Sequence, residues 1–166
     1  VMMISTKGRY ALRVMVDIAE RSSGEFIPLK DIASHQEISE KYLESIVVIL
    51  SRAGFLEGMR GKGGGYRLTR YPEDYTVGSI LKLTEGSLKP VACLEDSPNR
   101  CLRASTCRTL PLWTRLDDMV DGFLEGVTVA DLLDDEWRVD GVGEDDTESP
   151  TRVERRTARA MTSASL

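Results

Sequence analysis

Residues 38–68 read ISEKYLESIVVILSRAGFLEGMRGKGGGYRL, and this stretch decides the fold. Ser39 is a typical helix N-cap residue, and Gly54 is a typical helix stop. After Gly54, residues 55–60 and 66–69 have the composition of two short strands, joined by the glycine-rich residues 61–65. The stretch therefore predicts a helix followed directly by a β-hairpin. The apolar residues that recur at helical spacing on one face of this helix are Tyr42, Leu43, Ile46, Val47 and Leu50.

A second, shorter helix is expected just before this one. Pro28 can begin it, it ends near His35, and residues 37–39 form a tight turn into the next helix. Two helices joined in this way form a helix-turn-helix, although helical hairpins are also common as plain packing. Because a β-hairpin directly after a helix-turn-helix is a wing, we interpret the stretch as a winged-helix DNA-binding domain. Ser5 or Thr6 can cap an earlier core helix.

The net charge of −5 argues against a nucleic-acid partner, but it is an average over two parts of the chain with opposite charge. Residues 1–90 carry a charge of +2, whereas residues 91–166 carry −7. Positive charge is densest from Arg52 to Arg70, where Glu57 is the single acid. This segment is the place to look for phosphate contacts. Its positive residues are Arg52, Arg60, Lys62, Arg67 and Arg70, of which Arg60, Lys62 and Arg67 flank the wing.

The glycine-rich loop has two alternative interpretations. A hairpin tip without function is one of them. A nucleotide-binding phosphate loop is the other, and we discard it because the Gly-x-x-x-x-Gly-Lys-Ser/Thr spacing is missing and a strand follows the loop instead of a helix.

The second half of the chain predicts an irregular loop and a helix that needs a partner surface. Thr76 can cap a helix from Val77 to about Thr84, and residues 87–106 then show little periodicity. The apolar helix that follows Pro111 is expected to form the interface of a homodimer; packing against its own domain is the alternative. The interface residues expected on this helix are Leu112, Trp113, Leu116, Met119, Val120 and Phe123.

These patterns divide the chain into four parts. The fold is expected to be mostly α with a small β-hairpin wing, formed by a winged helix-turn-helix domain over residues 2–86. A cysteine-containing sensor loop follows over residues 87–110. Residues 111–134 hold the dimerisation helix and a short helix capped by Thr128, and residues 135–166 are expected to be a disordered tail. Since the chain lacks both the roughly 18 consecutive apolar residues of a membrane helix and the apolar core of a signal peptide, we expect a cytoplasmic protein without a membrane partner.

The chain has three cysteines, Cys93, Cys101 and Cys107, with the spacing C-x7-C-x5-C. An odd number of cysteines in one window is not the paired framework of a secreted domain. The spacing also differs from the C-x2-C pairs of zinc ribbons and ferredoxins. We expect free thiols or metal ligands, and the spacing alone does not decide between them.

Three motifs together resemble a known family: ISTKGRYAL at residues 4–12, ISEKYLE at residues 38–44 and RGKGGGYRL at residues 60–68. Over about residues 2–133 the chain is similar to the winged-helix transcription regulators of the IscR, NsrR and CymR family. The resemblance implies a homodimer that places two recognition helices in successive major grooves of a palindromic double-stranded site, with the wings near the minor groove. The DNA-binding residues expected are Ser39, Lys41, Tyr42, Glu44, Arg52, Arg60, Lys62, Gly63, Gly64 and Tyr66.

Two of these residues, Tyr42 and Glu44, match family positions near the DNA. The Glu44 carboxylate can accept a hydrogen bond from the amino group of a cytosine, which would make it a base-reading residue. The alternative is a solvated acid on the helix surface without such a role.

The cysteine window resembles the three-cysteine loop of the IscR and NsrR members of this family. The resemblance implies an iron-sulfur cluster, 2Fe-2S or 4Fe-4S, bound by Cys93, Cys101 and Cys107. Neighbouring arginines are expected to lower the thiol pKa values and to offset the negative charge of the cluster. These arginines are Arg100, Arg103 and Arg108.

The chain also departs from the family pattern. Leu110 stands where IscR carries a histidine ligand, and Arg9 stands where some relatives have an acidic ligand. A fourth ligand would have to be Glu95, Asp96, a carboxylate of another chain, water or a small thiol. The rival interpretations are a three-thiolate zinc site and thiols that sense oxidation.

The leading hypothesis is a repressor whose operator affinity is controlled by the cluster. A second version keeps the DNA binding but senses a sulfur metabolite, zinc or thiol oxidation. A cysteine-dependent enzyme is a remote alternative, because the sole histidine, His35, is expected on a distant helix and a catalytic cysteine needs a nearby base. A module that binds only other proteins is a further alternative.

Overall fold

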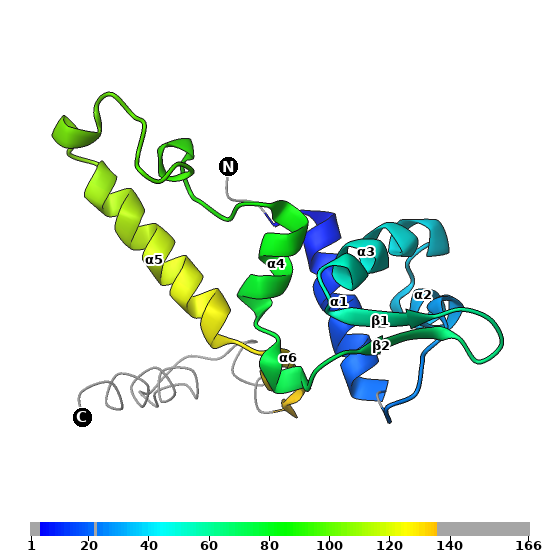
Figure 1. Ribbon diagram of the computed structural model, residues 1–166. Coiled ribbons are helices and arrows are strands. Elements are labelled where there is room, and N and C mark those ends of the chain that lie inside the picture. The colour runs from blue at the N-terminus through cyan, green and yellow to red at the C-terminus, as the bar shows by residue number, and fades with distance from the viewer. Residues whose placement is uncertain (1–3, 22, 136–166) are drawn as a thin grey trace.

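The computed structural model of the protein describes residues 4–21 and 23–135. It is mostly helical with one antiparallel β-hairpin, as the sequence predicts (Figure 1). The predicted tail, apart from Asp135, lies outside the described residues. The helices are α1 (Thr6–Arg21), α2 (Leu29–Gln36), α3 (Glu40–Arg52), α4 (Val77–Glu85), α5 (Leu110–Gly126) and α6 (Val129–Leu133), the strands are β1 (Leu56–Met59) and β2 (Gly65–Leu68), and the 3-10 turns are η1 (Pro72–Asp74), η2 (Ala92–Leu94) and η3 (Ala104–Thr106).

Helix α1 forms the centre of the hydrophobic core. Its apolar residues recur at helical spacing and bury one side of the helix completely. Helices α2 and α3, strand β1 and helix α4 pack around it. The fully buried core residues of α1 are Ala11, Val14, Met15 and Ile18, and those of α3 are Leu43, Ile46, Val47 and Leu50.

The turn between α2 and α3 orients the second helix of the helix-turn-helix. Glu37 adopts a left-handed conformation with φ 55°, and its N–H donates to the Ser34 carbonyl at 3.3 Å. Ile38 is buried beside the turn, and Ser39 then caps α3. The turn predicted at residues 37–39 is confirmed.

A buried carboxylate fastens α2 to α1. The side chain of Asp17 on α1 is fully buried and contacts Arg21 and His35 Nδ1, while the Gln36 side chain donates to it at 3.0 Å. His35 is itself partly exposed on α2. Because Asp17 meets residues of α2 as well as its own helix, it holds the helix-turn-helix against the core.

The hydroxyl of Tyr75 supports the base of the hairpin. Tyr75 is fully buried, and its hydroxyl accepts from the backbone N–H groups of Thr69 at 3.0 Å and Arg70 at 2.8 Å. The same hydroxyl donates to the Phe55 carbonyl at 3.0 Å. These bonds join the residue before β1 to the residues after β2, so they fix the point from which the wing projects.

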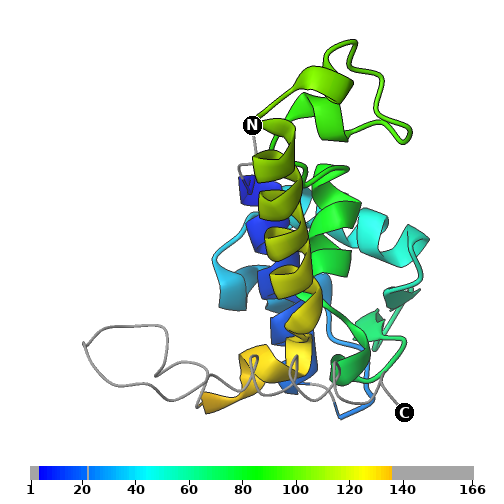
Figure 2. The ribbon, with the colours of Figure 1, turned by 90° about the vertical axis from the view of Figure 1, so that its left-hand side faces the viewer.

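The C-terminal helix α6 returns to the winged domain. The Val77 N–H donates to the Val127 carbonyl at 2.8 Å, and the Val129 N–H donates to the Tyr75 carbonyl at 2.9 Å. Val129 is fully buried in the main core, and Thr128 caps α6 as predicted. Helix α5 instead lies on the side of the winged domain opposite to the wing (Figures 1 and 2). The loop over residues 87–109 leads into its N-terminal end.

Candidate DNA-binding surface and sensor loop

Helix α3 presents its polar side to solvent. The Ser39 hydroxyl accepts from the Tyr42 N–H at 3.3 Å and thereby caps the helix. Its apolar residues turn toward the core, so the positions between them point outward. The residues of α3 and its cap that were expected to contact DNA are all exposed: Ser39, Lys41, Tyr42, Glu44 and Arg52.

Tyr42 lies at the edge of this exposed side, and its predicted place in the buried apolar face was wrong. Its ring meets the ring of Tyr10 edge-on, with 5.7 Å between the centroids, and Arg13 lies 5.2 Å from the Tyr10 centroid. The Ser45 hydroxyl donates to the Tyr42 carbonyl at 2.6 Å. Helix α1 therefore supports the recognition helix from one side.

The wing is a tight hairpin whose tip can be built only with glycine. The Gly64 N–H donates to the Gly61 carbonyl at 3.0 Å, and Gly61 and Gly63 have φ values of 92° and 76°. A Cβ on Gly64 would lie 2.2 Å from the Met59 carbonyl oxygen. Arg60 and Lys62 are exposed at this tip. The glycines therefore serve the hairpin geometry, and the two cations project beside them.

The two residues that follow the tip have structural partners. Tyr66 is half-buried, and its backbone exchanges hydrogen bonds of 2.8 and 2.9 Å with Ile27. Arg67 pairs with Glu57 at 3.0 Å, donates to the Gly24 carbonyl at 3.1 Å and lies over the Phe26 ring. Arg67 was expected to reach phosphate, but in this structure it fastens the wing to the segment before α2.

A groove of about 340 Å³ separates α3 from the wing. Arg52 lies on its helical side and Arg60 on its wing side, and neither forms an ion pair with another described residue. Two cations without an acidic partner suit an anionic ligand such as a phosphodiester. The groove is lined by Val48, Ser51, Arg52, Gly58, Met59, Arg60, Gly65 and Tyr66.

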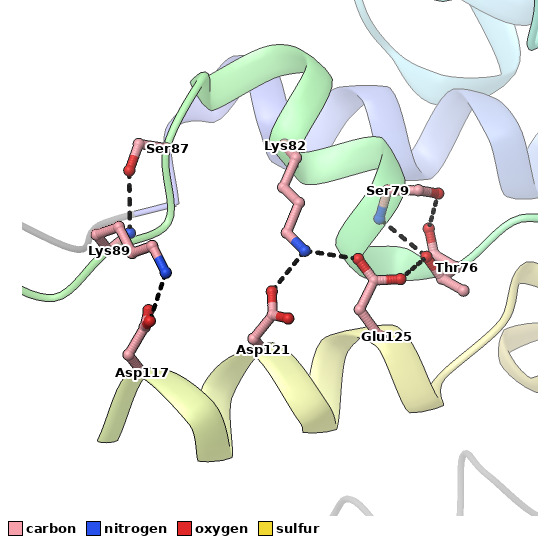
Figure 3. Close-up of polar contacts among 8 residues, drawn as sticks. All are labelled: Thr76, Ser79, Lys82, Ser87, Lys89, Asp117, Asp121 and Glu125. Atoms are coloured by element: carbon pink, nitrogen blue, oxygen red, sulfur yellow. Dashed lines mark hydrogen bonds and ion pairs between the residues drawn. The ribbon is translucent and has the colours of Figure 1, made fainter. Parts of the chain in front are cut away.

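Helix α5 faces its own domain with acidic residues (Figure 3). Lys82 of α4 pairs with Asp121 at 2.5 Å and with Glu125 at 2.8 Å, and Lys89 pairs with Asp117 at 2.5 Å. The three acids are spaced four residues apart, so they share one side of the helix. We refer to these contacts of Asp117, Asp121 and Glu125 as the acidic ladder.

The acidic ladder shifts the pKa values of its members. Burial, which would raise the pKa of Glu125, is outweighed by hydrogen bonds from Lys82 and Thr76, so this pKa lies below its usual value. The hydrogen bond to Asp121, followed by that to Glu125, raises the pKa of Lys82. A Cβ on Gly78 would lie 2.6 Å from the Glu125 carboxylate, so a larger residue at position 78 would displace this side chain. Sequence reasoning missed the ladder, whose only signal was the four-residue spacing.

The opposite side of α5 is apolar and open. No residue of α5 is fully buried, and Leu112, Met119 and Phe123 are exposed to 59%, 65% and 54%. The other predicted interface residues, Trp113, Leu116 and Val120, are partly buried. Packing of this helix against its own domain is therefore confirmed in part, through its acids and Leu124, whereas the dimer interface on its apolar side stays a prediction.

The three cysteines lie along the loop before α5 as free thiols. Cys93 belongs to η2, and Cys107 follows η3. The Cys101 N–H donates to the side chain of Asn99 at 2.8 Å. Hydrogen bonds from the Thr109 hydroxyl and nearby backbone N–H groups lower the pKa of the Cys107 thiol, and the charge of Arg103 adds the smallest effect. Arg103 thus acts as expected from the sequence, but hydrogen bonding has the larger effect.

The loop does not bring metal ligands together in this conformation. Within residues 4–21 and 23–135, no three side chains of His, Cys, Asp or Glu lie close enough to hold a metal ion. Of the two acids considered as a fourth ligand, Glu95 accepts from Ser87 at 2.8 Å and Asp96 lies 3.8 Å from Arg100. The donor chemistry of three thiols still suits an iron-sulfur cluster, because such clusters are held by thiolates.

Comparison with known proteins agrees with this architecture. Residues 4–135 match the Rrf2 family, described as iron-dependent transcriptional regulators. The chain belongs to the Rrf2 family. Its relatives include the transcriptional regulator IscR of Aliivibrio salmonicida, which is 34% identical over 134 residues, covering 81% of this chain and 79% of the relative. The Rrf2 assignment makes the chain a DNA-binding transcription regulator and confirms the family resemblance of its motifs.

Solved structures of Rrf2 regulators have the same fold. The CymR structure, from the global cysteine regulator of B. subtilis, has a TM-score of 0.66 and 38% identity, covering 80% of this chain and 96% of that one. IscR of T. potens has a TM-score of 0.65 and 32% identity, covering 86% and 93%. Among the described residues of this Rrf2 protein, no helix has both the length and the apolar character needed to cross a membrane.

Proposed function

We propose that this Rrf2 protein is a homodimeric repressor of palindromic operators whose DNA affinity is set by the state of the loop over residues 87–110. The observation that carries the proposal is the orientation of α5. Its acidic side is fastened to the winged domain, its apolar side is open, and the cysteine loop leads directly into it. One helix thus connects the sensor loop, the dimer contact and the DNA-binding domain.

The DNA contact follows from exposed cations that surround the groove beside α3. Lys41 and Arg52 on α3, and Arg60 and Lys62 on the wing, are exposed. With α3 in the major groove and the wing near the minor groove, the strand between the two grooves lies against these residues. Glu44 stands on the exposed side of α3 and can accept from a cytosine amino group.

The dimer contact follows from the apolar side of α5. A helix with exposed Leu112, Met119 and Phe123 loses unfavourable contact with water when a second copy covers it. Two-fold packing of α5 on α5 gives each protomer the same surface, which is how homodimers close. It also places two recognition helices in one particle, as a palindromic operator requires.

The sensor is a cluster bound by Cys93, Cys101 and Cys107. These residues can supply three thiolates, and the lowered pKa of Cys107 favours the form that binds metal. When bound, an iron-sulfur cluster supplies sensitivity to oxidants and to iron supply. The loop has to close for the three thiols to meet, because they are not gathered in this structure.

The acidic ladder is the route from the loop to the DNA-binding domain. Lys89 stands at the start of the loop and Asp117 on α5, so their ion pair joins the start of the loop to the helix that follows it. Closure of the loop moves α5 against α4, and the Lys82 contacts pass this movement to the winged domain. In a dimer, a shift of α5 changes the spacing of the two recognition helices.

The first test combines a spectrum with a DNA-binding assay. Wild type and Cys101→Ala are purified without oxygen, assayed for iron and sulfide, and titrated onto the upstream region of the protein's own gene. A visible absorption band that is lost together with DNA affinity in Cys101→Ala supports the cluster-gated repressor. In parallel, Arg60→Ala with Lys62→Ala should abolish binding.

A second candidate keeps the DNA binding and uses the thiols themselves as the sensor. Two observations favour it: the lowered pKa of Cys107, which raises its reactivity toward oxidants, and the 38% identity to the cysteine regulator CymR. A colourless protein that binds DNA when reduced and loses binding after mild oxidation would establish this version. If changing Arg60 and Lys62 to Ala leaves DNA binding intact, both versions are contradicted.

A further inference from the structure

The exposed side of α3 has an apolar residue at its centre. At 100° per residue, positions 41, 45, 48 and 52 lie opposite the buried side of the helix. Lys41, Ser45 and Arg52 are polar or charged, as expected for a surface that meets water or DNA. The fourth position is Val48, whose side chain is 43% exposed. Val48 belongs to neither hydrophobic core cluster of the described residues, so core packing does not account for a valine at this point.

The surroundings of Val48 are those of a DNA-binding groove. Val48 lines the groove between α3 and the wing, and Met59, which is 44% exposed, lines it as well. Arg52 and Arg60 lie in the same groove and have no acidic partner among the described residues. The apolar atoms therefore stand between two cations that attract phosphates, which brings them to the DNA surface.

A valine on a recognition helix has one way to distinguish base pairs. It can neither donate nor accept a hydrogen bond, so it cannot read the polar edges of the bases. The major groove shows one exposed apolar group, the 5-methyl of thymine. Contact with deoxyribose is also apolar, but it carries no sequence information. Because Val48 stands at the centre of the exposed side, with Arg52 following on the same side of the helix, it faces the bases when α3 lies in the groove.

We propose that Val48 is a specificity-determining residue that reads a thymine methyl group in each half of the operator. The inference rests on the proposed docking of α3 in the major groove. It assigns a base contact to a residue outside the polar set that the sequence had indicated. It also predicts that each half-site contains a thymine whose methyl group contributes to affinity, independently of the base pairing of that thymine.

Replacement of thymine by deoxyuridine tests this directly, because it removes only the methyl group. The probe is a duplex that the wild-type protein selects from a randomised library, with each thymine replaced in turn in both half-sites. At one position the wild type should lose about fourfold in affinity per half-site, the value of burying one methyl group. Val48→Ala should bind the unmodified duplex more weakly and should respond less to deoxyuridine at that position, because it loses both γ-methyl groups.

Val48→Thr is the matched control, since it keeps one branched methyl group that can touch thymine. It should still discriminate thymine from deoxyuridine, and thermal melts should show all three proteins folded because residue 48 is largely outside the core. The inference is overturned if no position responds in the wild type, or if Val48→Ala keeps the same response. Failure of the wild type to select any duplex would instead overturn the proposed function itself, and this inference with it.

Discussion

The Tyr75 hydroxyl offers a sharp test of how the wing is held. Tyr75→Phe keeps the buried ring and removes only the oxygen. That oxygen accepts from the Thr69 and Arg70 N–H groups and donates to the Phe55 carbonyl. We expect the substitution to destabilise the whole protein, although the wing itself projects into solvent, because the bonds lie at its base.

The size of the effect follows from which groups lose their partners. The Phe55 carbonyl and the Thr69 N–H still bond each other at 3.3 Å, so neither is left alone. Among the described residues the Arg70 N–H has no other hydrogen-bond acceptor, and an unsatisfied backbone group costs about 1–3 kcal/mol. We therefore expect the free energy of unfolding to fall by about 2 kcal/mol, since the Phe55 carbonyl and the Thr69 N–H keep a neutral hydrogen bond.

Urea unfolding and calorimetry at a fixed protomer concentration measure this loss, because dimer dissociation would otherwise enter the result. A decrease of about 2 kcal/mol corresponds to a decrease in Tm of about 6 °C for a chain of this size. Tyr71→Phe is the matched control, because Tyr71 is exposed. A loss below about 0.5 kcal/mol for Tyr75→Phe would refute the assignment of the hydroxyl as the support of the hairpin.

Three further predictions concern α5 and the loop before it. Since contacts with Lys82 and Thr76 hold the pKa of Glu125 below its usual 4.5, folding stability should fall as the pH drops below about 4.5, and Glu125→Gln should flatten this part of the profile in acid-unfolding measurements. Thr109→Val should slow the alkylation of Cys107 at neutral pH several-fold by removing the largest cause of its lowered pKa, as mass spectrometry after timed iodoacetamide treatment can show. Phe123→Asp should give a folded monomer in analytical ultracentrifugation, because Phe123 is exposed in the protomer; a persistent dimer would contradict the α5 interface.

The local elements could be predicted because each is determined by neighbouring residues. Ser39 caps α3 and Thr128 caps α6 through bonds that reach three residues ahead. Gly61 and Gly63 adopt positive φ at the tip, as a tight hairpin requires. The apolar spacing in α3 likewise gave its buried side apart from Tyr42, so the winged-helix fold followed from short-range patterns.

The remaining parts depend on contacts that no local pattern shows. As a cation beside the wing, Arg67 was expected to contact phosphate. It instead pairs with Glu57 on the opposite strand and lies over the ring of Phe26 from another segment. Asp17 is a charged residue that is buried because α2 packs over it, and no local pattern shows this contact. The acidic ladder could not be predicted without knowing which side of α5 packs against α4. The positions of the three thiols relative to one another likewise depend on the path of an irregular loop.

The Lys89–Asp117 ion pair has a consequence for metal capture, because it turns the intervening segment into a tethered ring. Cys93, Cys101 and Cys107 all lie within this ring, so none of them can drift far from the others. Once one thiolate holds a metal, the next binds at an effective concentration in the millimolar range instead of from bulk solution. Closing a shorter ring also costs less entropy than ordering a free chain. If the proposed cluster is bound by these cysteines, Lys89 and Asp117 would therefore influence its affinity without touching it.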